Sequence, residues 1–212
     1  TPSGIPDYRD ASGNWKPAPP VLGAQFVREL PARQRYWARS LNGWPCFRAA
    51  EPNAAHRALA SLEQRGHVRH LITQNVDGLH QRAGSRAVTE LHGSLARVRC
   101  LGCDAVCTRA EVQRVLERDN AGFRNLDAAP APDGDAQLET QRLGGFRVPD
   151  CPRCGGTLKP DVVFFGESVP AVRVTESYAV VDDAEVLLVA GSSLTVMSGL
   201  RFVRHAAKAG KP

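Results

Sequence analysis

The side chains best suited to chemistry are concentrated in residues 70–85, HLITQNVDGLHQRAGS. An apolar run typical of a buried strand ends there in a series of polar side chains: Thr73, Gln74, Asn75, Asp77 and His80. In open parallel sheets, ligands bind beyond the carboxyl ends of the strands, where loops and helix N-termini converge. The run is therefore a candidate ligand site, although Asp77 or His80 taken alone could simply cap a helix.

A second apolar run, residues 185–193, ends in Gly191, Ser192 and Ser193 ahead of a predicted helix. In that position backbone N–H groups and hydroxyls can bind a phosphate. Glycine-serine turns also follow many strands that bind nothing, so this turn supports a ligand site only in combination with other features.

The cysteines indicate a metal site rather than a disulfide framework. Four of the six fall in two C-x2-C pairs: Cys100, Cys103, Cys151 and Cys154. Two such pairs supply the four thiolates of a tetrahedral structural zinc, whereas disulfide frameworks are typical of small secreted chains. The 47 residues between the pairs exceed the usual spacing and predict an insertion. Cys107 is close enough to compete as a ligand, but its spacing from Cys103 does not suit a zinc knuckle.

A repeated order of helix and strand indicates an α/β fold with a parallel sheet. Residues 53–66 predict an amphipathic helix ended by Gly66, and residues 68–72 predict the strand that follows it. The order recurs in a helix predicted over 171–184 and a strand predicted over 185–193. This second strand is apolar on both faces, as strands of parallel sheets are.

The segment between the cysteine pairs is expected to form a small module of its own. Thr108 and Glu111 have the spacing of a capping box, which predicts a helix over residues 108–118. Residues 128–137, AAPAPDGDAQ, are rich in Pro, Gly and Asp and predict a loop without strand or helix. We therefore divide the chain into a discontinuous sheet domain and an inserted zinc module: residues 1–95 with 160–212, and residues 96–159.

Composition and charge exclude a membrane protein and disfavour a nucleic-acid partner. The 212 residues are 42% hydrophobic and 23% charged, and no apolar run reaches the roughly 18 residues that a membrane span needs. Of the 27 basic residues behind the net charge of +5, 23 are Arg, scattered along the chain rather than clustered. Between the cysteine pairs only Phe123 and Phe146 could stack on bases, and several Asp residues oppose a polyanion.

Six motifs occur together and in order along the chain. They are SGIPDYR at 3–9, TQNVDGLHQRAG at 73–84, ELHGS at 90–94, the two cysteine pairs, KPDVVFFGE at 159–167 and GSSLTV at 191–196. This set resembles the sirtuins, the NAD-dependent protein lysine deacylases, over essentially the whole chain. IPDYRD, ITQNVD and APDGDAQL are similar to the class II branch of the family, which has mitochondrial and bacterial members.

The resemblance implies a Rossmann-like α/β large domain with an inserted zinc module, and NAD meeting an acyl-lysine peptide in the cleft between them. In the family, the acyl group moves from lysine to ADP-ribose and nicotinamide is released; protein mono-ADP-ribosylation at the same NAD site is the alternative function. His92 matches the catalytic histidine, and an imidazole suits the proton transfers because its usual pKa lies near neutrality. One structural zinc ion, held by the four paired cysteines, is the second cofactor.

The resemblance assigns three groups of residues to NAD. The first matches a mobile cofactor loop, with tyrosine where many members have phenylalanine: Gly4, Ile5, Pro6, Asp7, Tyr8 and Arg9. The second lines the pocket for nicotinamide and its ribose: Gln74, Asn75, Val76 and Asp77. The third lies at the second polar strand end: Gly191, Ser192 and Ser193.

The segment after the second cysteine pair is expected to bind the substrate peptide as an added strand. Its residues are Val162, Val163, Phe164, Phe165, Gly166 and Glu167. Tyr36 and Arg39 have the Tyr-x-x-Arg spacing by which some family members hold an acidic acyl chain, and one helical turn places both on one face. We therefore hypothesise tolerance of acidic or branched acyl groups. The alternative for Arg39 is an exposed position on an amphipathic helix.

Two elements of the family pattern are not present in this sequence. A first strand with a glycine turn is expected before Thr1, and strands with ribose and adenine contacts are expected after Pro212, so we expect the chain to be part of a longer protein. Cysteine ligands and NAD chemistry favour a reducing compartment, the bacterial cytoplasm, with the mitochondrial matrix as the alternative. The expected partners are acyl-lysine proteins or peptides and no membrane; the sequence does not determine the oligomeric state.

Overall fold

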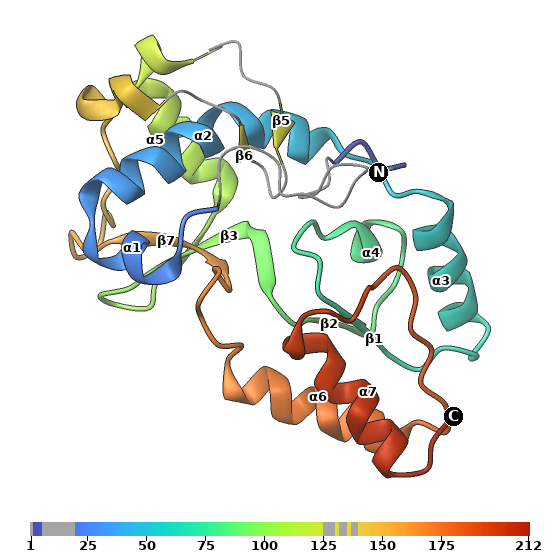
Figure 1. Cartoon of the computed structure of the whole chain (residues 1–212). Coiled ribbons are helices and arrows are strands. Elements are labelled where there is room, and N and C mark those ends of the chain that lie inside the picture. Colours follow the sequence, from blue (N-terminus) through green and yellow to red (C-terminus); the bar gives the residue numbers. More distant parts are fainter. Residues whose placement is uncertain (1, 6–19, 125–129, 132–134, 137–139) are drawn as a thin grey trace.

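The computed structural model describes residues 2–5, 20–124, 130–131, 135–136 and 140–212 (Figure 1). Its α-helices are α1 (Gly23–Arg28), α2 (Leu30–Ala49), α3 (Ala54–Gln64), α4 (Leu79–Arg82), α5 (Arg109–Asp119), α6 (Ala171–Asp183) and α7 (Met197–Lys208). Two 3-10 helices are η1 (Ala121–Phe123) and η2 (Thr140–Gly145). The strands are β1 (Leu71–Thr73), β2 (Val88–Glu90), β3 (Gly93–Cys100), β4 (Val106–Thr108), β5 (Pro130–Ala131), β6 (Asp135–Ala136) and β7 (Leu158–Val162).

The strands β1 and β2 form a parallel pair whose register joins Leu71 to Val88. The connection between them contains α4, so strand, helix and strand follow one another along the chain. The helices α6 and α7 lie beside the pair (Figure 1), and Leu91, Val181 and Phe202 form a buried apolar cluster there. Because the two strands are parallel, the residues that follow β1 and those that follow β2 lie at the same edge of the sheet.

The strand β3 is central in a three-stranded antiparallel sheet with the order β4-β3-β7. The helices α2 and α5 pack over this sheet (Figure 1), and the main apolar cluster includes Trp37 of α2, Leu116 of α5 and Val98 of β3. Since β3 runs from Gly93 to Cys100, one continuous strand connects the His92 turn to the first cysteine pair.

The expected domain boundaries fall inside this antiparallel sheet. The boundary after residue 95 lies within β3 and the boundary after residue 159 lies within β7. These two strands pair with each other, with Gly93 opposite Val162 and Cys100 opposite Leu158. The two expected units therefore share a strand pair, and the division of the chain stays a prediction.

The helices predicted from periodicity and capping are confirmed. The helix α3 begins after Asn53, whose side chain accepts N–H bonds from the first turn, and Gly66 just beyond its end has φ 78°. The helix α5 has the predicted capping box, in which Thr108 Oγ1 accepts from Glu111 N and Thr108 N donates to the Glu111 carboxylate. The helix α6 matches the one predicted over 171–184.

The strand predicted over residues 68–72 is shifted toward the C-terminus. It is β1, which begins at Leu71. The backbone N–H groups of His67 and Val68 bond the carbonyl of Leu62 and hold this part of the chain against the end of α3. The chain is therefore free to pair as a strand only after these two residues.

The strand predicted over residues 185–193 is wrong. The chain has no regular structure in that segment. Val186 and Leu188 are 60% and 70% exposed, although the sequence predicted a strand covered on both faces. An apolar run forms a strand only where a neighbouring strand accepts its backbone hydrogen bonds. Within the described ranges, no strand pairs with residues 185–193.

The prediction of a loop without strands over residues 128–137 is also corrected. Pro130 pairs with Ala136 in the antiparallel pair β5–β6, each strand of which has two residues. Two residues in each strand are too few to show an alternating pattern, so the sequence did not reveal this pair.

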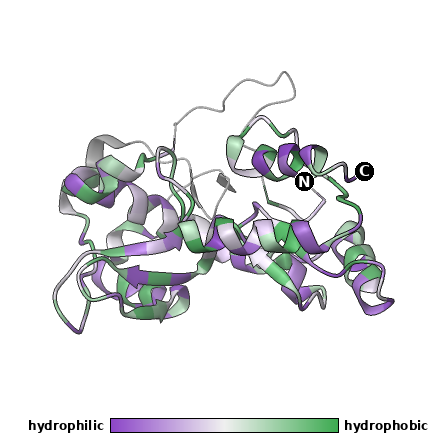
Figure 2. Cartoon of the chain, turned by 90° about the horizontal axis from the view of Figure 1, so that it is seen from below, coloured by the Kyte–Doolittle hydropathy of each residue, from purple (hydrophilic) through white to green (hydrophobic). Residues whose placement is uncertain are grey.

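Hydrophilic and hydrophobic residues are interleaved along the helices (Figure 2), which is the pattern of amphipathic helices with one face packed against the protein. Among the described helices, none has the length and apolar character needed to cross a membrane.

Candidate functional site

His92 lies in the turn between β2 and β3, at the edge of the parallel pair. Its backbone carbonyl accepts a hydrogen bond from Val163 N at 2.8 Å. The next residue, Gly93, has φ 87°, and a Cβ at this position would lie 2.0 Å from the carbonyl oxygen of Asp161. Only glycine fits so close an approach of two backbones, so the backbone at His92 is held tightly against the segment that follows β7.

The imidazole of His92 belongs to a hydrogen-bonded series of four side chains, which we call the His92 series: His92, Ser198, Gln74 and Ser192. His92 Nε2 lies 2.9 Å from Ser198 Oγ, and Gln74 Nε2 donates to the same oxygen at 3.2 Å. Ser192 Oγ donates to Gln74 Oε1 at 3.2 Å. The residues in each contact are 106 to 124 positions apart in the sequence. Gln74 follows β1 and His92 follows β2, while Ser192 lies in the loop before α7 and Ser198 in the first turn of α7.

The environment of His92 favours its neutral form. Burial lowers the pKa of His92 below its usual value of 6.5, and the positive charge of Arg173 lowers the pKa further. A hydrogen bond with the backbone of Gln74 opposes this shift in part. A neutral imidazole can accept a proton from a hydroxyl, which is the function required of a general base.

Small residues next to the His92 series leave space for the Gln74 amide. A Cβ on Gly199 would lie 3.0 Å from the amide carbon, nitrogen and oxygen of Gln74. Gly191 has φ 65° and forms the turn that leads to Ser192. An amide, two hydroxyls and an imidazole therefore meet where the sequence predicted a pocket for nicotinamide and ribose.

The expected cofactor loop is described only at its start. Four of its residues lie outside the described part of the chain: Pro6, Asp7, Tyr8 and Arg9. Gly4 has φ 80°, and Ile5 packs against the apolar cluster around Trp44, as do Val76 and Val162. Residues expected in the cofactor loop, the NAD pocket and the substrate strand are therefore neighbours.

The remaining predicted cofactor residues have local contacts or face solvent. Asp77 Oδ1 accepts from Leu79 N at 2.9 Å, so this carboxylate bonds the first residue of the short helix α4, whose N-cap is Gly78. Asn75 is exposed, and its backbone N–H donates to Thr73 Oγ1. Ser193 is exposed in the loop before α7. Their contacts with NAD stay predictions.

The predicted substrate segment changes from buried to exposed within two residues. Phe164 is 7% exposed and packs edge-on against Phe26, with ring centroids 5.1 Å apart. Phe165 is 40% exposed and forms a parallel bridge with Leu22. Gly166 is exposed beyond it, with φ 82°. One side of the segment is therefore anchored in the core while the other faces outward.

An ion pair between a buried lysine and a partly exposed glutamate closes the turn at the end of this segment. Lys159 Nζ lies 3.0 Å from Glu167 Oε2 and donates to the carbonyl of Val162 at 2.6 Å. Glu167 Oε2 also accepts from Phe164 N at 2.8 Å. Burial lowers the pKa of Lys159, and the Glu167 carboxylate opposes that shift. The position of the predicted substrate strand thus depends on Lys159, which sequence reasoning did not identify.

Tyr36 and Arg39 lie on α2 and point into the fold. Tyr36 packs against Phe26, Trp37 and Phe164, with ring centroids 5.2 to 5.4 Å away. Arg39 is 4% exposed, so the alternative of an exposed arginine on a surface helix is wrong. Phe164 connects Tyr36 to the predicted substrate segment, and a role of the two residues in acyl binding stays a prediction.

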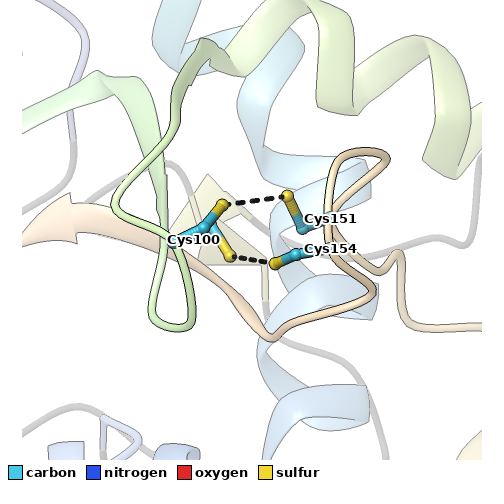
Figure 3. Close-up of side chains that lie close together, drawn as sticks. Cys100, Cys151 and Cys154 are labelled. Atoms are coloured by element: carbon cyan, nitrogen blue, oxygen red, sulfur yellow. Dashed lines mark hydrogen bonds between the residues drawn. The ribbon is translucent and has the colours of Figure 1, made fainter.

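The paired cysteines form one compact cluster (Figure 3). All four sulfur atoms lie within 4.8 Å of one another: those of Cys100, Cys103, Cys151 and Cys154. The distance from Cys100 Sγ to Cys154 Sγ is 3.5 Å, and that from Cys103 Sγ to Cys151 Sγ is 3.8 Å. A tetrahedral zinc with Zn–S bonds of about 2.3 Å holds its sulfurs roughly 3.8 Å apart, so this cluster fits one zinc ion.

Backbone N–H groups in the two cysteine turns favour thiolates. Gly102 N donates to Cys100 Sγ at 3.3 Å, and Gly156 N donates to Cys154 Sγ at 3.4 Å. Burial alone would raise the pKa of Cys100, but the N–H donors and neighbouring thiols lower it to about 7. Cys107 is not a member of the cluster, and burial raises the pKa of its thiol. That Cys107 is not a ligand stays a prediction, which its position outside the cluster supports.

Comparison with known proteins identifies the family. Residues 1–198 match the Sir2 family. The chain belongs to the Sir2 family. It is 59% identical over 212 residues to the NAD-dependent protein deacetylase of Xanthomonas campestris pv. campestris (strain 8004), an alignment that covers 100% of this chain and 72% of the relative.

Two solved structures of Sir2 proteins resemble this Sir2-family chain. A crystal structure of a Sir2 homologue–NAD complex has a TM-score of 0.69 and 30% identity, covering 99% of this chain and 70% of that chain. A Sir2 protein in complex with an inhibitor, 2′-O-acetyl-ADP-ribose and deacetylated p53 peptide has a TM-score of 0.59 and 33% identity. The alignment covers 76% of this chain and 57% of that chain. The predicted Rossmann-like α/β fold with a parallel sheet is confirmed.

Sequence reasoning about this Sir2-family chain missed Ser198 and Gly199. Both lie inside a segment predicted as helix, where a serine has no spacing that marks it. The available signal was the occurrence of Ser198 and Gly199 side by side at the start of the helix. Both have low helix propensity, which suggests that they are there for a reason other than helix formation.

Proposed function

We propose that this Sir2-family protein is an NAD-dependent protein deacetylase, which transfers the acetyl group of acetyl-lysine to ADP-ribose and releases nicotinamide. The observation that carries the proposal is the position of His92, neutral and hydrogen-bonded to Ser198, beside the segments expected to bind NAD and peptide. The Xanthomonas relative, of which this chain covers 72%, is an NAD-dependent protein deacetylase.

The residues around His92 suit NAD, which supplies a ribose whose nicotinamide can leave. Gln74 and Ser192 would bind it through their amide and hydroxyl groups, with the exposed Ser193 available to a phosphate. His92 Nε2 would take a proton from a ribose hydroxyl, since its lowered pKa keeps it unprotonated at neutral pH. Ile5 and Val76, which share one apolar cluster, would cover the apolar side of the pocket.

The segment after β7 suits an extended peptide. Phe165 is exposed and its backbone carbonyl accepts from Gly23 N at 3.0 Å, so one edge of the segment is already paired. Main-chain hydrogen bonds on the other edge would bind a peptide of any sequence, as in other cases of strand addition. This arrangement would bring an acetyl-lysine side chain toward His92, whose carbonyl bonds Val163 N.

Zinc would have a structural role. Four thiolates fill a tetrahedral shell and leave no position for water or substrate. The zinc ion would therefore stabilise the segment between the cysteine pairs and would take no part in acetyl transfer.

The finer assignments belong to the same proposal. Motifs such as ITQNVD support the class II branch, and the Tyr36–Arg39 spacing supports tolerance of acidic or branched acyl groups. A glutaryl-peptide rate far below the acetyl-peptide rate would contradict that tolerance, and a glutaryl rate unchanged by Arg39→Ala would contradict the role of Arg39. Cysteine ligands for zinc support a reducing compartment, the bacterial cytoplasm or the mitochondrial matrix. The proposed domain division is 1–95 with 160–212, and 96–159.

A double-label experiment tests the reaction and separates it from protein mono-ADP-ribosylation. An acetyl-lysine peptide labelled in the acetyl group is incubated with the protein and with NAD labelled in the adenine. Deacetylation places both labels in one small product, O-acetyl-ADP-ribose. The adenine label on protein, with the acetyl label still on lysine, would instead establish ADP-ribosyl transfer.

A further inference from the structure

We propose that Ser198 is a positioning residue for His92: its hydroxyl holds Nε2 of the imidazole in the proton-accepting form. Ser198 is in turn held by the carboxamide of Gln74. The inference rests on the proposed function, because it assigns Ser198 a role in the proton transfer performed by His92.

The position of Ser198 is unusual for a serine in a helix. It is the second residue of α7, it is 8% exposed, and its oxygen lies 2.9 Å from His92 Nε2 and 3.2 Å from Gln74 Nε2. Serines inside helices commonly bond a carbonyl of their own helix. Ser177 on α6 is an example, since its Oγ donates to the carbonyl of Arg173 at 2.7 Å. The hydroxyl of Ser198 instead bonds two side chains from distant parts of the chain.

The donors in the His92 series have one consistent direction. Ser192 Oγ donates to Gln74 Oε1, so the oxygen of the amide faces Ser192 and its nitrogen faces Ser198. An amide NH2 can only donate, which means that Ser198 Oγ accepts from Gln74. The proton of the Ser198 hydroxyl is then directed to His92 Nε2.

The other ring nitrogen of His92 completes the same arrangement. The backbone of Gln74 hydrogen-bonds the imidazole in a way that favours the protonated ring, as donation from a ring N–H to a carbonyl does. Because Nε2 accepts from Ser198, the proton of the neutral ring is on Nδ1. With its proton on Nδ1 and a hydroxyl donating to Nε2, His92 keeps a lone pair on the nitrogen that would receive the proton from ribose.

The positive charge of Arg173 favours the neutral form of His92, as the proposed hydrogen bond from Ser198 does. Arg173 of α6 is the charged group whose field reaches the imidazole, and its guanidinium lies 3.8 Å from Asp161. Within the described part of the chain no carboxylate is hydrogen-bonded to His92, and the side-chain group at its Nε2 is the hydroxyl of Ser198.

Imidazole nitrogen NMR on the NAD-free protein tests the inference directly. We expect wild-type His92 to carry its proton on Nδ1 near neutral pH. In Ser198→Ala we expect a mixture of tautomers and a higher pKa of His92, because the donor to the neutral Nε2 is lost. Ser198→Thr restores the hydroxyl and should restore both properties. Ser177→Ala, which removes a buried hydroxyl that donates to a carbonyl of its own helix, is the matched control.

The kinetic consequence is measured on the same variants with NAD and an acetyl-lysine peptide. Ser198→Ala should lower kcat by about ten- to a hundredfold with little change in the KM for peptide, and should shift the acidic limb of the rate profile to higher pH. If the alanine variant does not fold, Ser198→Cys offers the same comparison with a weaker donor. An unchanged His92 tautomer and pKa in the variant would overturn the inference, as would an equal loss in Ser177→Ala.

The two proposals fail in distinguishable ways. If wild-type protein releases no nicotinamide but His92 titration depends on Ser198, the proposed function is wrong and the hydrogen-bonding role of Ser198 stands. If nicotinamide release requires His92 while the tautomer and pKa of His92 are the same in Ser198→Ala, the proposed function stands and the role of Ser198 is wrong.

Discussion

The zinc cluster takes its four ligands from two short turns, whereas the His92 series takes its members from three separate segments of the chain. Each cysteine turn carries its own N–H donor, from Gly102 in one and Gly156 in the other. The His92 series has no comparable local unit, because each of its contacts spans 106 positions or more. One site depends mainly on a metal and the other on the packing of the whole sheet edge.

A single strand joins these two regions. The strand β3 begins beside His92 and ends at Cys100, and it pairs with β7 at both ends, with a register shift between Gly93 and Val98. The comparison therefore predicts which perturbations remain local and which spread. Loss of zinc should act on the cysteine side first, and distortion at the start of β3 should act on His92.

The largest expected effect is that of zinc removal. A structural zinc site contributes on the order of 10 kcal/mol of coupled binding and folding free energy, so chelation or Cys151→Ser should unfold the segment between the cysteine pairs. Amide hydrogen exchange should show α5 and β4 losing protection before α3. Cys107→Ser, outside the cluster, is the control and should keep both zinc content and protection.

Equal and simultaneous loss of protection in α3 and α5 would show that the two regions are one cooperative unit. In that case the contrast between a local and a distributed site would concern only the ligands and not the stability of the fold.

A smaller effect is expected from Gly93→Ala. A left-handed backbone costs alanine about 1–2 kcal/mol, and here the added Cβ would also lie 2.0 Å from the Asp161 carbonyl oxygen. Gly66→Ala is a matched control, with φ 78° and no atom within 4 Å of the added Cβ. Urea unfolding should show a clearly greater loss of stability in Gly93→Ala, together with a loss of activity that Gly66→Ala does not share. Similar losses in both variants would mean that the close contact of β3 with β7 relaxes easily.

The smallest effect expected is a dependence of stability on pH that arises on the His92 side. All six histidines lie outside residues 96–159. Burial lowers the pKa values of His56, His70, His80 and His92 below 6.5. The unfolded chain then binds more protons, so stability is complete above pH 6.5 and is lost as the pH falls through the folded values.

Urea midpoints measured at about pH 7.5 and about pH 5.5 check this dependence. The rings of His56 and His80 have centroids 4.6 Å apart, so charging one ring disfavours charging the other. The double variant His56→Gln/His80→Gln should reduce the difference between the two midpoints while zinc content stays constant. A difference of the same size in the double variant would assign the pH dependence to other groups.

Sequence reasoning succeeded where chemistry is local. The spacing of Cys100 with Cys103 and of Cys151 with Cys154 was sufficient for the cluster, and the capping box at Thr108 was sufficient for α5. Both patterns are complete within a few residues, so no knowledge of the remaining chain was required.

It failed where the outcome depends on partners elsewhere in the chain. Residues 185–193 have the composition of a buried strand, but a strand requires a neighbour that the pattern cannot supply. Ser198 was missed for the same reason, because its function comes from His92 and Gln74 rather than from its own surroundings. The roles assigned to Tyr36, Arg39 and the NAD-binding residues came from family resemblance and stay predictions.

Nicotinamide release from NAD, measured with and without an acetyl-lysine peptide in the wild-type protein and in His92→Ala, tests the central claim most directly. We expect release that requires the peptide and that falls by about 10²- to 10⁴-fold when the imidazole is removed. Release that is independent of the peptide, or that is equal in His92→Ala, would contradict the assignment of deacetylation to His92.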